Sequence, residues 1–295
     1  MSPPETESAE GVSSPPDWTE IGEEIRCPLC GYNLRGLKAP RCPECGYSFT
    51  WPEVLDPRRR LHPYLFEHHP ERNVWSFWKT ARGAMRPLKF WTSLHPVQPS
   101  NLRRLVAYCL IGEAAYSAAF FAMIAAILIS NNARRGAGSG LSFAGLVSEV
   151  LDVLTASGAQ VIWLVVLGIP LLWPWATYAA LRLFWISMRR AKVNRAHVLR
   201  CAIYSFDFNL WIGLLLLVVA LLTATAVPFN GIDDPLVIGV PVYWAYAWIM
   251  GTVRLYVAYR SYLRFSHPLL TVLTCQFLVI FLAFDLWAFA VTHRD

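Results

Sequence analysis

The chain has 295 residues, of which 55% are hydrophobic and 16% are charged, and its formal net charge is +6. A soluble domain usually carries about 25% charged residues, so this composition indicates that one part of the chain lies in lipid. The same values exclude a disordered chain, a collagen-like chain and a secreted disulfide scaffold.

Charge divides the chain into regions. Residues 1–25 hold seven acidic residues and no Lys or Arg, whereas residues 26–104 hold 14 basic residues against five acidic ones, a net charge of +9. The Ser-, Pro- and Glu-rich residues 1–24 cannot bury enough apolar surface to fold, so we expect a disordered acidic tail there. The chain does not begin with a basic segment followed by an apolar run, so we expect no signal peptide and a cytoplasmic N-terminal part.

A cysteine motif occurs twice in residues 25–50. The six-residue pattern C-P-x-C-G-Y recurs after 15 residues, and the cysteines in it are Cys27, Cys30, Cys42 and Cys45. Two cysteines three positions apart can place both sulfurs on one metal ion, and the glycine that follows permits a left-handed turn. Two such knuckles supply four thiolates, which is a closed tetrahedral zinc site. We therefore expect one structural Zn²⁺ in a small β zinc ribbon, with a short hairpin that bends near Gly36.

Two other interpretations of these cysteines are weaker. Disulfides are disfavoured in a reducing cytosol. Iron is an alternative because the knuckles resemble those of rubredoxin, although a rubredoxin-type site needs a larger aromatic core. In so small a module, metal binding supplies the fold, and it contributes roughly 10–16 kcal/mol in zinc-finger peptides. The other cysteines, Cys109, Cys201 and Cys275, lie in apolar segments and are expected to be inert small hydrophobes.

The run from residue 27 to residue 37, followed by residues 41–46, resembles a zinc-ribbon module found at the N-termini of many bacterial membrane proteins of uncharacterised function. The resemblance covers about 20 residues. It implies a small structural ribbon and no reaction.

Residues 51–72 are rich in Pro, Arg and His, and we expect a basic linker there. Its run of three arginines, residues 58–60, is typical of a membrane-proximal charge cluster, and nucleic-acid binding is the alternative. His62, His68 and His69 have no Cys or acidic residue at ligand spacing, which favours linker histidines over a second metal site.

Residues 73–91 have the pattern of a basic amphipathic helix. The residues that fall on its apolar face are Val74, Phe77, Trp78, Ala81, Ala84, Met85 and Leu88, and the basic face holds Lys79, Arg82, Arg86 and Lys89. Such a helix suits the headgroup layer of a membrane with anionic lipids, and Pro87 should end or bend it. The alternative is an ordinary helix packed on the ribbon.

Five apolar segments in residues 103–295 are each near or above the roughly 20 residues that a membrane-spanning helix needs. They are residues 105–130, 161–187, 202–227, 236–259 and 269–291, and they predict an all-α membrane bundle. With the N-terminus inside, the inner loops and helix ends carry nine Lys and Arg and the outer ones carry three. This asymmetry predicts a multi-pass protein of the cell membrane with a cytoplasmic N-terminus and an outside C-terminus.

Four ionisable residues fall within these spans near their inner ends. At about 1.5 Å per residue, Glu113 is about 12 Å deep, Arg182 and Arg254 about 9 Å, and Asp207 about 6 Å. Unpaired charges at this depth cost at least a few kcal/mol each, and paired charges that face the bundle cost far less. We expect at least one acid–base contact in this polar layer, with Glu113–Arg254 or Glu113–Arg182 as the leading pair. The alternative is that both arginines extend to the inner surface.

The membrane part is similar to the Yip family, which has a cytosolic N-terminus and five spans. The similarity lies in residues 86–91 before the first span, in residues 197–205 at the start of the third span, and in the number of spans. It implies a non-enzymatic membrane scaffold or adaptor. The four cysteines in front are not part of that family's usual pattern, so its role in vesicle traffic does not carry over.

The most consistent function is that of a non-catalytic scaffold or adaptor that displays the ribbon to a cytosolic protein. A small transporter or channel is the alternative because ionisable residues lie inside spans. A membrane-tethered nucleic-acid binder is a second alternative, but Tyr32, Tyr47, Phe49 and Trp51 suffice only for the core of the ribbon. Paired carboxylates on one membrane face, a Ser-His-Asp arrangement and a Gly-rich phosphate loop are all missing from the sequence, so we expect no enzyme.

Overall fold

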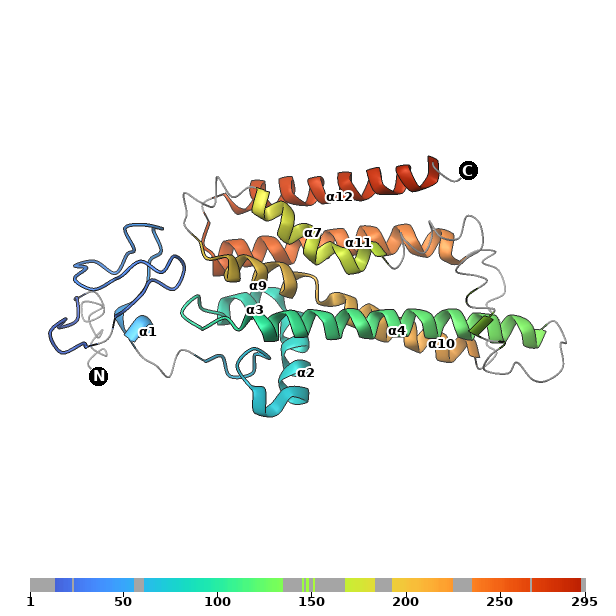
Figure 1. The fold of residues 1–295 in the computed structure, drawn as a ribbon, viewed down its shortest axis with the longest axis horizontal. Helices are drawn as coiled ribbons and strands as arrows, with labels where there is room; N and C mark the ends of the chain where they lie inside the picture. Colours follow the sequence, from blue (N-terminus) through green and yellow to red (C-terminus); the bar gives the residue numbers. More distant parts are fainter. Residues whose placement is uncertain are drawn as a thin grey trace, which may run out of the picture.

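The computed structural model describes residues 14–22, 24–55, 61–134, 145, 147–148, 151, 168–183, 193–224, 235–265 and 267–292. Over these residues the protein is mainly helical and contains no β-strand. The region with the four cysteines, residues 24–50, is called the cysteine module below. It lies at one end of the molecule, and the long helices run away from it along the longest axis (Figure 1).

The helices that precede the long apolar segments are short, and they are α1 (Trp51–Leu55), the 3₁₀ turn η3 (Pro70–Arg72), α2 (Asn73–Ala84) and α3 (Pro87–Ser93). The helices of the apolar part are α4 (Leu102–Arg134), α7 (Ile169–Leu183), α9 (Arg195–Ser205), α10 (Phe208–Ala224), α11 (Pro235–Val257), the π-helical turn η5 (Ala258–Tyr262) and α12 (Pro268–Thr292). The beginnings of α4, α9 and α12 lie at the same end as the cysteine module, and α12 ends at the opposite end (Figure 1).

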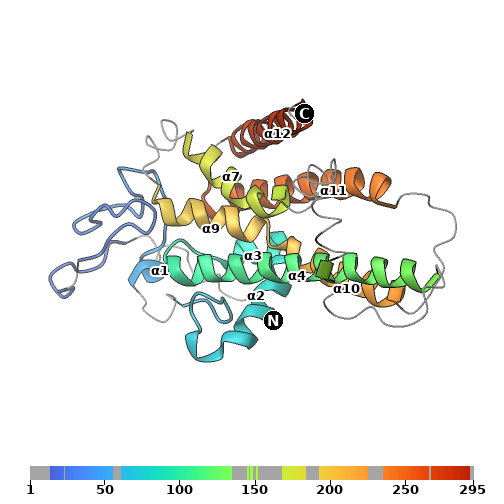
Figure 2. The same ribbon diagram turned by 45° about the vertical axis from the view of Figure 1, so that its right-hand side comes forward.

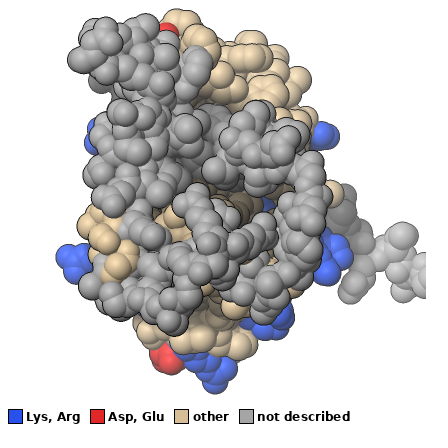
Figure 3. Space-filling view, turned by 90° about the vertical axis from the view of Figure 1, so that its right-hand side faces the viewer, with Lys and Arg blue, Asp and Glu red and all other residues tan. Residues whose placement is uncertain are grey.

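Three helical segments of the described chain are long and apolar enough to cross a membrane. They are Leu102–Ser130, Arg195–Leu222 and Pro268–Asp285. They coincide with the first, third and fifth predicted spans. At the end opposite the cysteine module, the described atoms are mostly neither acidic nor basic, and the Lys and Arg side chains in view lie around the outline (Figure 3). The second predicted span is represented by the 15 residues of α7 and the fourth by α11.

The third predicted span is interrupted near its beginning. Helix α9 ends at Ser205 and α10 begins at Phe208, so the break lies at Phe206 and Asp207. The side chain of Asn209 donates a hydrogen bond to the carbonyl oxygen of Pro170 in α7 (3.1 Å). The apolar pattern alone does not predict this break.

Helices α4 and α10 run side by side in both ribbon views (Figures 1 and 2). Their backbones come very close at Gly213, where a Cβ atom would lie 2.9 Å from the Cα of Tyr116. A small residue at a helix crossing is the usual way for helices in lipid to approach each other, because dispersion contacts are the main attraction there.

The predicted helix over residues 73–91 is two helices. Helix α2 ends at Ala84, and Pro87 occupies the first turn of α3, so the expected interruption at Pro87 is confirmed. Proline suits this position because the first turn of a helix has no intrahelical partner for its N–H. Helix α2 lies across the beginning of α4 (Figure 1), where the rings of Phe77 and Tyr108 are 5.0 Å apart.

The prediction of a linker over residues 51–72 is wrong for most of this segment. Trp51 and Val54 of α1 are buried, and so are Leu65 and Phe66. Arg104 at the start of α4 donates to the carbonyl oxygen of Phe66 (2.8 Å). Short apolar groups and buried backbone contacts therefore fold this segment onto the helices despite its polar composition. The arginine run at residues 58–60 lies outside the described residues.

The histidines of this segment bind protein groups. His62 contacts the Ser93 hydroxyl (3.2 Å), and His68 donates to the carbonyl oxygen of Pro99 (2.8 Å). Burial lowers the pKa of His62 to about 4, so this side chain is neutral at pH 7. The only group of ligating side chains that could hold a metal among the described residues is the four-cysteine cluster.

The acidic tail also needs a correction at its end. The residues before 14 lie outside the described part, but the ring of Trp18 packs edge-on against Trp51 at 5.2 Å. Arg35 donates to the carbonyl oxygen of Trp18 (3.1 Å). The last part of the expected tail is therefore attached to the cysteine module, because an aromatic side chain there has a ring to pack against.

Candidate metal centre

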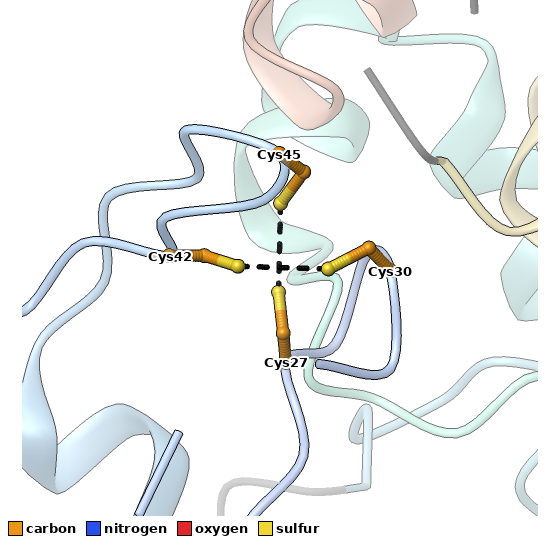
Figure 4. A group of neighbouring side chains, drawn as sticks. All are labelled: Cys27, Cys30, Cys42 and Cys45. Carbon is orange, nitrogen blue, oxygen red and sulfur yellow. Dashed lines mark hydrogen bonds between the residues drawn. The ribbon is translucent and has the colours of Figure 1, made fainter. Parts of the chain in front are cut away.

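The four predicted ligand side chains point toward one common centre (Figure 4). The Sγ atoms of Cys27 and Cys45 are 3.6 Å apart, those of Cys30 and Cys42 are 3.5 Å apart, and all four lie within 4.8 Å of one another. Zinc held tetrahedrally by sulfurs at about 2.3 Å requires sulfurs about 3.8 Å apart. A disulfide requires about 2.05 Å. The cluster therefore fits one metal ion, and each of the seven cysteines is free of disulfide bonds.

The two knuckles have equivalent backbone hydrogen bonds. The backbone N–H of Cys27 donates to the carbonyl oxygen of Tyr32 (2.6 Å), and that of Cys42 donates to Tyr47 (2.9 Å). Each knuckle also contains one isolated antiparallel bridge, Arg26 with Asn33 and Arg41 with Ser48. The 15-residue sequence repeat is thus a structural repeat, although its short hairpins contain no strands.

Glycines produce the turns that the motif predicts. Gly31 and Gly46, which follow the second cysteine of each knuckle, have φ angles of 78° and 72°. Gly36, at the bend between the knuckles, has a φ of 82°, and the N–H of Leu37 donates to the carbonyl oxygen of Leu34 there (3.2 Å). A side chain is strained in this left-handed region, so the three positions favour glycine.

A small aromatic core supports the cluster. The ring of Tyr47 stacks on Phe49 at 6.3 Å, and Phe49 meets Trp51 edge-on at 5.1 Å. All three rings are buried, and so is Leu34. This core is continuous with the first helical turn after the module, which is why the module and α1 form one unit.

Hydrogen bonding within the cluster favours a thiolate at one sulfur. The pKa of Cys27 is lowered to about 5, chiefly because its sulfur accepts a hydrogen bond from Cys45. Burial raises the pKa of Cys30 to about 12. A thiolate is the form of cysteine that binds metals. The basic side chains near the cluster, Arg26, Arg35, Lys38 and Arg41, are exposed.

The first knuckle is bound to the beginning of α9. The N–H of Asn194 donates to the carbonyl oxygen of Leu29 (2.7 Å), and His197 Nε2 donates to the carbonyl oxygen of Pro28 (2.8 Å). Pro28 and Leu29 are the two residues between the ligands Cys27 and Cys30. The loop that carries two of the sulfurs therefore rests directly on the start of α9.

The second knuckle is bound to the segment between η5 and α12. Arg264 donates to the carbonyl oxygen of Ser48 (2.9 Å), and its guanidinium lies 5.4 Å from the ring centre of Tyr47. Arg264 has a φ of 55°, the one positive φ at a non-glycine residue in the described chain. Both knuckles are thus attached to the bundle, each through different residues.

A buried ion pair that the sequence did not predict lies next to these contacts. Arg200 of α9 donates to both carboxylate oxygens of Glu67, each at 2.9 Å, and both side chains are fully buried. Tyr204 donates to Glu67 (2.9 Å), and Arg200 also reaches the carbonyl oxygen of Pro99 (2.9 Å) and the hydroxyl of Tyr262 (2.9 Å). This network joins residues 61–69 to α9 and η5.

The predicted polar layer is only partly assembled. Asp207 forms a buried ion pair with Arg254 of α11, and Tyr108 donates to the same carboxylate (2.9 Å). Glu113 contacts neither arginine, so the expected Glu113–Arg254 and Glu113–Arg182 pairs are wrong. It accepts hydrogen bonds from Trp175 (3.0 Å) and Cys109 (3.2 Å). The ion pair in this layer involves Asp207 and not Glu113, because at the break between α9 and α10 the Asp207 carboxylate faces Arg254 of α11.

Arg182 lies apart from this pair. It is an exposed residue in the last turn of α7, and its guanidinium is 5.9 Å from the ring centre of Tyr178. Its placement resembles the alternative in which a long basic side chain extends out of the bundle.

A cavity lies beside the ion pair. It is small and partly open to the outside, and it lies between α2, α4, α7 and the α9–α10 break. Its lining includes Phe77, Tyr108, Glu113, Pro174 and Asp207. Glu113, whose carboxylate accepts from Trp175 and Cys109, borders this space.

The basic surface of α2 and α3 has the four predicted residues exposed, namely Lys79, Arg82, Arg86 and Lys89. The apolar side of this region is divided. Phe77, Ala81 and Ala84 are buried against the protein, whereas Val74, Trp78, Met85 and Leu88 remain 41–74% exposed. An exposed apolar stripe therefore lies beside the basic one.

Comparison of the chain with protein-family models, with curated proteins and with solved structures found no match.

Proposed function

We propose that the chain is an integral membrane protein that presents a structural zinc ribbon on the cytoplasmic side and acts as a non-catalytic adaptor for a cytosolic protein. The observation that carries this proposal is the attachment of both knuckles to the bundle, at Asn194 and His197 and at Arg264. A ribbon held in this way is a fixed platform and not a freely tethered domain.

The metal assignment follows from the donor set. Four thiols that converge within 4.8 Å form a closed site, and Zn²⁺ is the ion that such structural sites hold most often. Residues Cys27, Cys30, Cys42 and Cys45 would hold the ion. Bound zinc would supply folding free energy to the module and no open position for a substrate.

The five-span topology and the likeness to the Yip family belong to the same proposal. Helices α4, α9–α10 and α12 are long and apolar enough for three of the spans. We assign α7 and α11 to the other two; α11 covers residues 235–257, and α7 covers residues 169–183, nearly all of the described part of residues 161–187. The excess of inner Lys and Arg supports a cytoplasmic cysteine module and an outside C-terminus.

The exposed surface of the module indicates the kind of partner. Arg35 and Lys38 are exposed on the turn between the knuckles, around Gly36. The aromatic rings that nucleic-acid stacking would need are buried in the module, apart from Tyr32, which is 38% exposed. A rigid basic turn with few free rings favours an acidic protein surface over nucleic acid.

Pull-down from membranes tests the adaptor function. The intact protein and a Cys109→Ser variant, which changes a cysteine outside the metal site, should capture the same cytosolic protein. Cys30→Ser and the double variant Arg35→Glu/Lys38→Glu should each lose it, the first through loss of the ribbon and the second through loss of charge. Equal capture by all four proteins would contradict the proposal.

Helix α2 and the start of α3 are proposed to lie on anionic lipid headgroups. Their exposed basic and apolar stripes are adjacent, which is the arrangement of an interfacial helix. In vesicles with anionic lipid, Arg82→Glu/Arg86→Glu should increase chymotrypsin cleavage near Trp75 and Trp78. Arg260→Glu, at an exposed site on η5, is the control. Unchanged cleavage in the double variant would count against docking on lipid.

Transport remains the second candidate function, and the cavity with Glu113 is the observation that favours it. An ionisable side chain inside a span is commonly part of an ion or substrate path. Ion flux through proteoliposomes that disappears in Glu113→Gln, with the fold intact, would favour transport over the adaptor.

A further inference from the structure

We propose that metal binding at the cysteine cluster holds the cytoplasmic ends of α9 and α12 in place, so that gain or loss of the metal changes the arrangement of these membrane helices. The inference rests on the proposed metal centre and adds a regulatory role to it. Its basis is the pair of separate attachments between the knuckles and the helix ends.

The first attachment depends on the metal loop itself. Pro28 and Leu29 lie between two ligand cysteines, so the direction of their carbonyl groups follows from the closure of the knuckle on the metal. Those carbonyls accept the hydrogen bonds from His197 and Asn194. A knuckle without metal has little core to keep its shape, and both donors at the start of α9 would lose their acceptors.

The contact continues into the bundle. Because His197 Nε2 donates to a carbonyl, the neutral ring accepts at Nδ1, and its partner there is the hydroxyl of Tyr262 (2.7 Å). The same hydroxyl accepts from Arg200, which pairs with Glu67. An unbroken chain of hydrogen bonds therefore runs from the knuckle to the buried ion pair.

The second attachment holds an unusual backbone conformation. A φ of 55° is unfavourable for an arginine, and such a conformation persists only where its surroundings maintain it. At Arg264 the side chain is held by the Ser48 carbonyl and the Tyr47 ring, both in the second knuckle. The left-handed φ of Arg264 also belongs to the end of η5, where the N–H of Phe265 donates to the carbonyl oxygen of Tyr259 (3.1 Å). If the knuckle opens, the Arg264 side chain loses its partners in the module, and we expect this helix end to open more often, four residues before α12 begins at Pro268.

Hydrogen–deuterium exchange measured by mass spectrometry on the full-length protein in lipid nanodiscs tests the proposal. Zinc-loaded protein and protein treated with a chelator are compared, and metal content is measured on the same samples. Metal removal should speed exchange about tenfold or more in peptides that contain Asn194 and Leu263–Phe265, because local opening exposes those amides. Peptides from the middle of α4, around Tyr116, should exchange at the same rate in both samples.

The double variant His197→Ala/Arg264→Ala is the matched control, because it leaves all four thiols in place. It should bind one zinc per chain and show fast exchange at Leu263–Phe265 with or without the metal, because the side chain that ties this segment to the second knuckle is gone. Equal exchange in loaded and metal-free wild type would overturn the proposal. A uniform increase that includes α4 would also overturn it, because the metal would then act on global folding and not on the helix ends. Failure of the metal centre itself is recognised separately, by absence of metal from the purified protein.

Discussion

Replacing Arg200 with methionine should greatly reduce the amount of folded protein, because the Glu67 carboxylate would remain buried without its cation. The two side chains are fully buried and share two hydrogen bonds of 2.9 Å. Removal of one partner from a buried ion pair costs about 3–5 kcal/mol. A typical protein has only about 5–15 kcal/mol of stability in total, so this loss is a large part of it.

Thermal unfolding in detergent or nanodiscs measures the effect. Arg260→Met serves as the control, since Arg260 is exposed on η5 and donates, in an exposed contact, to the hydroxyl of Tyr256 one turn earlier (3.3 Å). The double variant Glu67→Gln/Arg200→Met should recover part of the loss, because it removes the uncompensated charge. A single variant that unfolds at the wild-type temperature would show that the pair does not hold residues 61–69 on α9.

Replacing Arg254 with methionine should have the second largest effect. Arg254 and Asp207 have only 3% and 4% of their side-chain surfaces exposed, and the pair joins α11 to the α9–α10 break. A carboxylate left alone inside the bundle costs several kcal/mol, so we expect the variant to unfold more easily or to lose α11 packing. Adding Asp207→Asn should restore most of the stability, since asparagine can still accept from Tyr108.

Arg182→Met provides the comparison within the same predicted layer. Arg182 is exposed at the end of α7, and we expect a change of less than about 1 kcal/mol there. Chemical unfolding followed by tryptophan fluorescence would rank the variants. If Arg182→Met were as destabilising as Arg254→Met, the division of the layer into one ion pair and one peripheral arginine would be contradicted.

The four-cysteine cluster could be predicted because its determinants are local. Ligand spacing, the glycines at 31, 36 and 46 and the repeat itself all lie within about 20 residues, and the knuckle conformations follow from them. The apolar runs of α4, α9–α10 and α12 were equally clear, since span length depends on bilayer thickness and not on neighbouring helices. The interruption between α2 and α3 could also be predicted, because the effect of Pro87 on the backbone is local.

The pairing of charges could not be predicted, because it depends on which helices pack together. The depth of Glu113 suggested a basic partner, yet its carboxylate accepts hydrogen bonds from Trp175 and Cys109. Arg254 pairs instead with Asp207, which lies at the break between α9 and α10. A weak signal for the second ion pair was present. Glu67 directly follows the apolar run Tyr64-Leu65-Phe66, and a charge so placed in an otherwise polar segment is a candidate for burial.

Composition misled the prediction for residues 51–72. Proline, arginine and histidine are common in linkers, but here histidine side chains bind backbone carbonyls and Phe66 packs against Arg104 and Tyr108. Apart from the contact of His69 with His62, seven positions away, these contacts connect residues more than 30 positions apart. Long-range contacts of this kind cannot be predicted from a short stretch of sequence.

X-ray absorption at the zinc edge, combined with elemental analysis of protein purified from membranes, tests most directly whether the cysteine module is a metal centre. We predict one zinc per chain with four sulfur neighbours at about 2.3 Å. The Cys109→Ser variant should give the same spectrum, and Cys30→Ser should lose the metal or exchange a sulfur for a lighter ligand. Protein that carries no stoichiometric metal, or metal bound by fewer than three sulfurs in the intact chain, would contradict this account.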